Sequence, residues 1–208
     1  MKRYLYDFEY DSEFANEYNQ AYFIEDYEFF ISEITNRYGN LKGSLIDLCC
    51  GTGNIAKMLK LKYPELNVTG CDKSKDMIDI AKHNNCLVEF ILDDAINISQ
   101  KFDYILCNNA YRHFNNPELF WLAIKKMSHD KTKIFISDMI RPNSDIGVEN
   151  IVNEILPTDS YFIKSLTICL KLAYNENELK NQVPPEYSVK IVPTGIPDLK
   201  IFFISNVL

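Results

Sequence analysis

The sequence predicts an α/β protein built on a mostly parallel β-sheet. Short apolar runs alternate along the chain with amphipathic stretches of helical length. The first of the later runs ends in a glycine-rich turn that opens a helix, and the last two runs are separated by turn residues alone. Alternating strands and helices form parallel sheets, whereas two strands joined directly can only form a hairpin. We therefore expect one antiparallel strand in an otherwise parallel sheet.

Each element follows from a local pattern. Short apolar runs bounded by turn residues predict strands at 44–50, 67–72, 87–92, 102–108, 131–139, 187–193 and 199–208. Apolar residues at helical spacing predict helices at 54–63, 73–84 and 117–127, and a longer helical region over 144–181 that breaks near Pro157. The turn cluster TGIPD joins the last two strands.

The N-terminal region has a different character from the rest of the chain. Its first forty residues are acidic and aromatic, and apolar positions three and four apart predict one or two amphipathic helices. Gly39 and Gly43 flank a short loop that ends this region. No repeat or low-complexity linker follows. We expect a single domain over 1–208, in which 1–43 form a helical lid and 44–208 form the core.

Composition and charge restrict the classes of partner that we expect. The net charge is −7, whereas proteins that bind nucleic acid usually carry a basic surface, so nucleic acid is not an expected partner. No apolar run reaches the roughly 18 residues that span a bilayer, and the N-terminus lacks the apolar core of a secretion signal. We expect a cytoplasmic protein without a membrane partner. The six cysteines include no CxxC pair, so we interpret them as small buried residues and expect no metal site.

The strongest local signal is LIDLCCGTG at 45–53, between the first core strand and its helix. Glycines in such a turn let the backbone approach a ligand at the N-terminus of a helix. About twenty residues later, the second strand ends in Asp72, placed to accept hydrogen bonds from the two hydroxyls of a ribose. An unpaired charge at a strand end inside a crevice is costly. We therefore interpret Asp72 as a nucleotide ligand.

Further segments follow the glycine turn in a fixed order. LIDLCCGTGNIAKML resembles the motif D-x-G-x-G-x-G, and GCDKSKDM at 70–77 is similar to G-x-D-x-S-x-x-M. VEFILDDA at 88–95 and FDYILCNN at 102–109 resemble the third and fourth motifs of the same set, and AYRHF falls on the L-H-H-L that follows in many members. Together they identify 45–208 as similar to class I S-adenosylmethionine (SAM)-dependent methyltransferases. The resemblance implies a Rossmann-like seven-stranded sheet in the order 3-2-1-4-5-7-6, with helices on both faces, and SAM as the cofactor.

The resemblance also implies which residues hold the methionine end of SAM. The backbone at Cys49, Gly51 and Gly53 would bound it, and Asp47 would orient its amino group. Tyr18 or its neighbour Tyr22 could close over it. Cys49 departs from the motif, which has glycine there. A cysteine costs little at this position if its φ is negative, but strains the turn if φ is positive.

The adenosine end has its own set of implied ligands. Asp72 would bind the ribose, while Met77 and Lys73 would flank the adenine. Asp94 would accept a hydrogen bond from the adenine amino group, with the Ala95 amide nearby.

The chemistry implied is methyl transfer to a small-molecule acceptor by in-line displacement. Such a reaction mainly requires positioning and desolvation of the nucleophile, and a general base is needed only for a protonated acceptor. Asn108 would line the floor beneath the sulfonium. His113 is the candidate base because of its pKa range, and Tyr111 is a candidate substrate contact. The acceptor and the oligomeric state stay open.

Two other functions are compatible with parts of the pattern. Gly51-x-Gly53-x-x-Ala56 also satisfies the dinucleotide fingerprint of nicotinamide-dependent oxidoreductases. The acid at Asp47 and the terminal hairpin favour the methyltransferase over that class. The second alternative is a SAM-binding module that is non-catalytic or needs a partner protein.

Overall fold

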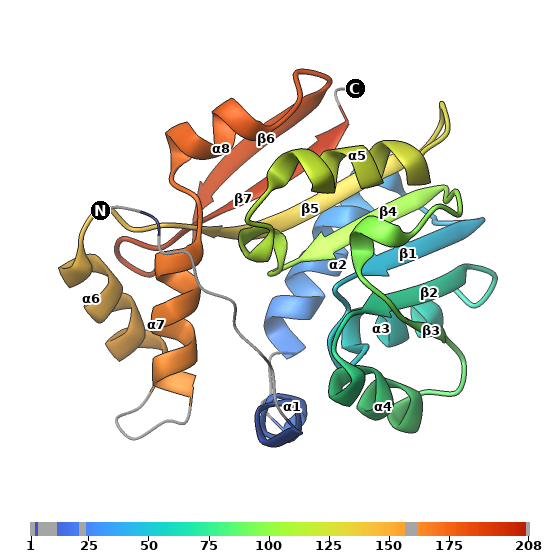
Figure 1. The fold of residues 1–208 in the computed structure, drawn as a ribbon, viewed down its shortest axis with the longest axis horizontal. Coiled ribbons are helices and arrows are strands. Elements are labelled where there is room, and N and C mark those ends of the chain that lie inside the picture. Colours follow the sequence, from blue (N-terminus) through green and yellow to red (C-terminus); the bar gives the residue numbers. More distant parts are fainter. Residues whose placement is uncertain (1–2, 4–11, 21–23, 157–161, 207–208) are drawn as a thin grey trace. The chain divides into compact units, whose positions relative to one another are not determined.

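A computed structural model describes Arg3 and residues 12–20, 24–156 and 162–206 (Figure 1). The chain separates into two compact units. The N-terminal unit comprises 8–108 and 118–135, and the C-terminal unit comprises 1–7, 109–117 and 136–208. Strand β5, Lys133–Ile140, passes from one unit to the other. The sequence had suggested one domain over 1–208, and the division between a lid and a core at residue 43 stays a proposal.

The strands form one seven-stranded sheet in the order β3-β2-β1-β4-β5-β7-β6, as predicted. Its other members are β1 Ser44–Leu48, β2 Asn67–Asp72, β3 Glu89–Leu92, β4 Tyr104–Asn108, β6 Tyr187–Pro193 and β7 Lys200–Asn206. β1 pairs in parallel with β2 and with β4, and β2 pairs in parallel with β3. β6 and β7 are antiparallel. This is the mixed sheet expected for a Rossmann-like fold with a terminal hairpin.

Eight α-helices occur in the described part of the chain. They are α1 Ser12–Gln20, α2 Ile24–Tyr38, α3 Asn54–Lys62, α4 Lys75–Asn84, α5 Pro117–Met127, α6 Asp145–Ile155, α7 Phe162–Leu172 and α8 Glu176–Gln182. The predicted helical region over 144–181 is thus divided into three helices. Its second break falls at Asn175, whose side chain and that of Glu178 cap each other's backbone N–H groups. Among the described residues, no helix has the length and apolarity to cross a membrane.

Helix α2 belongs to the core of the N-terminal unit. Phe30 and Ile34 are buried, and the Phe30 ring lies 5.4 Å from that of Phe135, centroid to centroid. The Tyr38 hydroxyl donates to the carbonyl of Ile134 at 2.7 Å. Removing α2 would therefore expose the apolar interior. We therefore place the test of the proposed lid on α1 alone.

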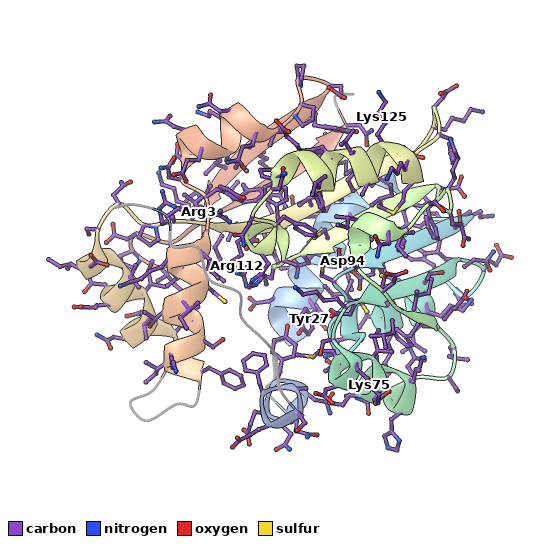
Figure 2. All side chains as sticks on the ribbon, in the orientation of Figure 1. Arg3, Tyr27, Lys75, Asp94, Arg112 and Lys125 are labelled. Carbon is purple, nitrogen blue, oxygen red and sulfur yellow. The ribbon has the colours of Figure 1, made fainter. Side chains whose placement is uncertain are left out.

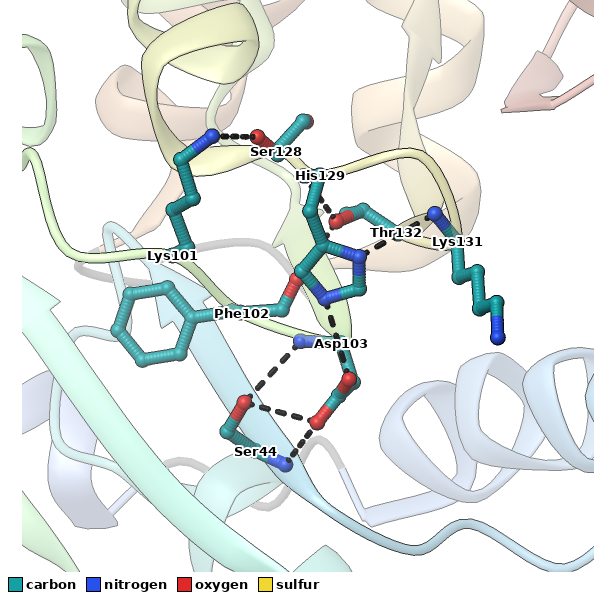
Figure 3. A network of polar contacts seen from close by, with 8 residues as sticks. All are labelled: Ser44, Lys101, Phe102, Asp103, Ser128, His129, Lys131 and Thr132. Atoms are coloured by element: carbon teal, nitrogen blue, oxygen red, sulfur yellow. Dashed lines mark hydrogen bonds and ion pairs between the residues drawn. The ribbon is translucent and has the colours of Figure 1, made fainter.

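A polar network joins the starts of β1 and β4 to the turn before β5 (Figure 3). The Asp103 carboxylate accepts hydrogen bonds from the backbone N–H and the hydroxyl of Ser44, at 2.8 and 3.0 Å. His129 Nε2 lies 3.1 Å from the other carboxylate oxygen. The Ser44 N–H is the main reason that the pKa of Asp103 lies below its ordinary value. The network fixes the strand ends opposite the glycine turn.

Gly43 is required beside this network. Its φ is +101°, and a Cβ there would lie 2.2 Å from Asp103 Oδ2. We predict that Gly43→Ala lowers the free energy of unfolding by about 2–4 kcal/mol, because backbone strain adds to displacement of the carboxylate. Gly195→Ala is the matched control, since Gly195 has φ +92° and open space around it. Equal losses of unfolding free energy for both variants in urea denaturation would show that displacement of the Asp103 carboxylate contributes nothing to the effect.

Candidate functional site

The turn after β1 is built from left-handed backbone. Cys49, Gly51 and Gly53 have φ values of 55°, 54° and 77°. Gly53 is the N-cap of α3 and provides no side-chain cap, so the turn presents the backbone N–H groups at the start of that helix. A helix N-terminus of this kind favours a negatively charged ligand group. The turn is therefore shaped for a ligand such as a carboxylate.

Gly51 and Gly53, the two glycines of the turn, have different surroundings. A Cβ on Gly53 would lie 2.6 Å from the ring of Phe90, which packs beneath the turn. A Cβ on Gly70, in β2, would be 2.7 Å from the same ring. Gly51 is different, because a Cβ there would meet only the Tyr18 ring, at 3.7 Å. Gly53 and Gly70 thus serve packing, whereas Gly51 leaves a free approach to the backbone.

Asp47, near the end of β1, is a buried carboxyl with an incomplete set of hydrogen-bond partners. Its side chain is buried, and its Oδ2 has no hydrogen-bond partner among the described residues. Burial, with the nearby charge of Asp72, raises the pKa of Asp47 to about 7, although the Ala56 N–H partly opposes this. A buried carboxylate oxygen without a donor is costly unless a ligand supplies one. A cationic ligand group is the natural partner.

Asp72 ends β2 and connects two turns. Its Oδ2 accepts the Gly51 N–H at 2.8 Å, and its Oδ1 accepts the Ser74 N–H at 2.9 Å. Burial raises the pKa of Asp72, while these two N–H groups lower it. An ionised carboxylate can accept about four hydrogen bonds. Asp72 can therefore hold the glycine turn and still accept bonds from ligand hydroxyls.

The predicted adenine residues lie in the segments that follow β2 and β3. Asp94 is half-buried, and its side chain accepts the Ile96 N–H at 3.1 Å, which caps a short 3₁₀ turn at Ala95–Asn97. Met77 is buried in the first turn of α4, and Ala95 is buried as well. Lys73 is exposed. Their roles toward adenine remain a proposal.

Helix α1 brings Tyr18 to the glycine turn. The Tyr18 hydroxyl lies 3.1 Å from that of Tyr27, which is buried in α2. Tyr27 in turn hydrogen-bonds Asn54 at the start of α3. Local sequence pattern does not distinguish Tyr27, because it is one aromatic residue among many at helical spacing. Tyr22 lies outside the described residues.

The remaining predicted residues lie at the end of β4 and in the short turn that follows it. Asn108 ends β4 in the N-terminal unit and is half-buried. Tyr111 and His113 belong to a short 3₁₀ turn, η2 (Tyr111–His113), in the C-terminal unit. Tyr111 is fully buried, with its ring 5.5 Å from that of Tyr174. His113 is half-exposed and is the more accessible of the two candidates.

The positive φ of Cys49 settles the question that the sequence left open, because a side chain there is strained. A hydrogen bond with Cys107, followed by burial, raises the pKa of the Cys49 thiol well above its ordinary value. We predict that the free energy of unfolding of Cys49→Gly is about 1 kcal/mol higher than that of Cys49→Ala, since glycine alone adopts this backbone without cost. The Cys49→Gly variant should therefore have the higher midpoint in urea denaturation. Both variants lack the thiol, so equal midpoints would mean that no strain is stored there.

Comparison with known proteins agrees with this geometry. Residues 45–128 match the family described as methyltransferase domain. The chain is 30% identical over 125 residues to a demethylmenaquinone methyltransferase of Thermotoga maritima, covering 59% of this chain and 55% of that protein. It is 28% identical over 90 residues to a malonyl-[acyl-carrier protein] O-methyltransferase of Priestia megaterium, covering 41% and 33%. The chain thus spans about half or less of the length of these relatives.

Solved structures share the fold at low sequence identity. The plantazolicin methyltransferase BamL, in complex with a desmethylPZN analog and SAH, has a TM-score of 0.71 at 16% identity and covers 94% of this chain and 89% of its own. The magnesium protoporphyrin IX methyltransferase of Synechocystis PCC 6803, with bound SAM, has a TM-score of 0.58 at 13% identity, covering 88% and 79%. Strand order and glycine turn define a class I Rossmann-like fold. Residues 45–128 thus resemble a methyltransferase domain, and the fold is that of the SAM- and SAH-bound methyltransferases described above.

Proposed function

We propose that this chain is an enzyme that transfers a methyl group from SAM to a small-molecule acceptor by in-line displacement. The observation that carries the proposal is the buried Asp47 carboxyl, whose Oδ2 has no partner among the described residues and which stands beside the open Gly51 turn. A structural carboxylate would have its own donors. The methionine end of SAM offers both an ammonium group for Asp47 and a carboxylate for the α3 N-terminus.

We propose that residues of the N-terminal unit hold the whole cofactor. Asp47 would orient the amino group, Asp72 would bind the ribose, and Gly51 would allow close approach of the backbone. Asp94 would accept from the adenine amino group, and Tyr18 would cover the methionine end. A buried carboxyl at Asp47 that lacks a partner among the described residues, together with Asp72 as a ribose ligand, favours SAM over a nicotinamide dinucleotide. The dinucleotide has no ammonium group to pair with Asp47.

SAM supplies an electrophilic sulfonium methyl group, so the protein has to position and desolvate the acceptor. Asn108 is proposed to line the floor of the site. His113 is proposed to take a proton from acceptors that arrive protonated. We propose a small-molecule acceptor because the acidic chain, with a net charge of −7, is unsuited to nucleic acid.

The proposal is tested by calorimetry with S-adenosylhomocysteine (SAH). We expect binding by the wild-type chain, and at least tenfold weaker binding by Asp72→Ala, because each lost charge-assisted hydrogen bond costs about 1.5–3 kcal/mol. NADH is the comparison ligand and should not bind. An unchanged dissociation constant in Asp72→Ala would remove Asp72 from the site, and no heat with SAH at millimolar concentration would reject the proposal. Binding without transfer of label from SAM to extract metabolites would favour the non-catalytic module.

A further inference from the structure

A buried ion pair fixes the turn that carries His113 in the C-terminal unit. Asp138, in β5, accepts the backbone N–H of Arg112 at 2.8 Å and also pairs with the Arg112 guanidinium. Both side chains are buried. The Tyr174 hydroxyl donates to the carbonyl of Phe114 at 2.5 Å, on the other side of the turn. The backbone of η2 is thus held in one position.

A second buried arginine is paired in the same unit. Arg141, just after β5, donates to Glu178 Oε1 at 2.7 Å and to the carbonyl of Ala173 at 3.0 Å. The charge of Arg141 therefore faces a carboxylate. Arg112 and Arg141 both follow the usual rule that a buried charge is compensated by an opposite one.

Arg3 is a third guanidinium in this region, close to Arg112 (Figure 2). Its Nη2 donates to the carbonyl of Arg112 at 2.6 Å, and its Nε donates to the carbonyl of Leu172 at 2.7 Å. Its Cζ lies 3.9 Å from the centre of the Tyr174 ring. Two carbonyls and one ring, all on buried or helical parts of the unit, thus fix the plane of the guanidinium.

Arg3 differs from the other two arginines of this region in how it meets a carboxylate: Glu178 pairs with Arg141 and acts on Arg3 only through its charge, without an ion pair. Among the described residues it forms no ion pair, although it is half-buried. Burial lowers the pKa of Arg3, but a guanidinium stays charged at neutral pH. A guanidinium has five N–H donors, and the two carbonyls use two of them. Even if the Tyr174 side chain takes a third, donors remain for a ligand.

We propose that Arg3 is an acceptor-recognition residue that binds a carboxylate group of the methyl acceptor. The planar fork of a guanidinium matches a carboxylate with two parallel hydrogen bonds, and a fork already held by the protein loses little entropy on binding. The site adjoins η2, which carries His113 and directly follows β4 in sequence. The inference rests on the proposed function in naming the methyl acceptor as the ligand, but anion binding at Arg3 can be measured without any turnover.

Nuclear magnetic resonance tests the anion site directly. The chain has four arginines, Arg3, Arg37, Arg112 and Arg141, so the Nε–H signals are few, and Arg3→Lys identifies that of Arg3. We expect sodium acetate to move the Arg3 signal in a saturable way, while acetamide and sodium chloride at equal concentration leave it in place. The Arg37 signal, from α2, is the internal control. An Arg3 signal that does not move with acetate, or moves equally with acetamide, would overturn the proposal.

Acceptor pairs that differ only as carboxylate and primary amide test specificity. The wild-type chain should have at least a tenfold lower KM for the acid than for the amide. Arg3→Gln should erase this preference with an unchanged SAH dissociation constant, Arg3→Lys should keep part of it, and Arg37→Gln should keep all of it. Equal losses of turnover on acid and amide in Arg3→Gln would make Arg3 a structural residue only. If no acceptor is methylated, the proposed function fails, and the acetate titration still decides the anion site.

Discussion

Asp47→Asn should stabilise the ligand-free protein at pH 8 and at the same time abolish most of its affinity for SAH. Burial and the charge of Asp72 raise the pKa of Asp47 to about 7 in the folded chain, from an ordinary value of 3.8. Between these two values the folded state keeps a proton that the unfolded state has released. Stability therefore falls as the pH rises through this window. Above about pH 7 the buried, ionised carboxylate destabilises the folded state.

The size of the gain follows from the pKa shift. The shift corresponds to about 4 kcal/mol as an upper bound, and the new amide of asparagine, buried without a full set of partners, takes back about 1–3 kcal/mol. We expect a net gain of about 1–3 kcal/mol at pH 8 and none at about pH 3, below both pKa values, where the acid is mostly protonated in both states. Thermal unfolding at the two pH values measures it.

Affinity should change in the opposite direction. If Asp47 pairs with the ammonium group of the ligand, its removal from a buried pair costs about 2–5 kcal/mol, which is at least thirtyfold in the SAH dissociation constant. Asp130→Asn, at an exposed position, is the control and should change neither quantity. A variant that loses stability at pH 8, or keeps its affinity for SAH, would mean that Asp47 is a structural residue. A gain in stability at pH 8 together with a loss of affinity for SAH would show that Asp47 serves ligand binding at a cost in stability.

Ala15→Arg should undock α1 and weaken the cofactor site while the rest of the fold survives. Ala15 is fully buried on α1, which packs against α4, and Asn19 of the same helix bonds Asn84 at 2.8 Å. Arginine cannot be accommodated there, so the helix should leave its place and take Tyr18 away from Gly51. Helix α2 stays in the core, so unfolding should remain cooperative.

We expect SAH affinity to fall about tenfold in this variant, and turnover to fall much further if α1 excludes water from the reacting groups. Hydrogen exchange should rise over 12–20 and stay unchanged over 24–38. Asn16→Arg introduces the same side chain at an exposed position of the same helix and should behave like the wild type. A molten Ala15→Arg variant would show that α1 is part of the core. An unchanged affinity and turnover with α1 undocked would exclude a lid.

Local pattern was sufficient to predict the mixed sheet and the glycine turn, and the resemblance to class I methyltransferases supplied the strand order. Alternation of strands with helices restricts the topology to very few arrangements, and the terminal hairpin permits only an antiparallel strand. The motif spacing placed Asp47 and Asp72 on neighbouring strands, and Asp47 and Gly70 are register partners in β1 and β2. These features depend on neighbours in sequence and on the general geometry of parallel sheets, so they can be predicted without coordinates.

The tertiary structure alone decided what each of these residues contacts. The sequence could not show that Gly53 and Gly70 make room for Phe90, that Cys49 has a positive φ, or that α2 is core. Arg3 is the clearest case, because it bonds Leu172, 169 positions away in the chain. No local pattern encodes a contact between such distant residues, since it depends on how several elements pack together. The sequence by itself determined the class of fold and the place of the glycine turn, and packing determined which side chains have partners among the described residues.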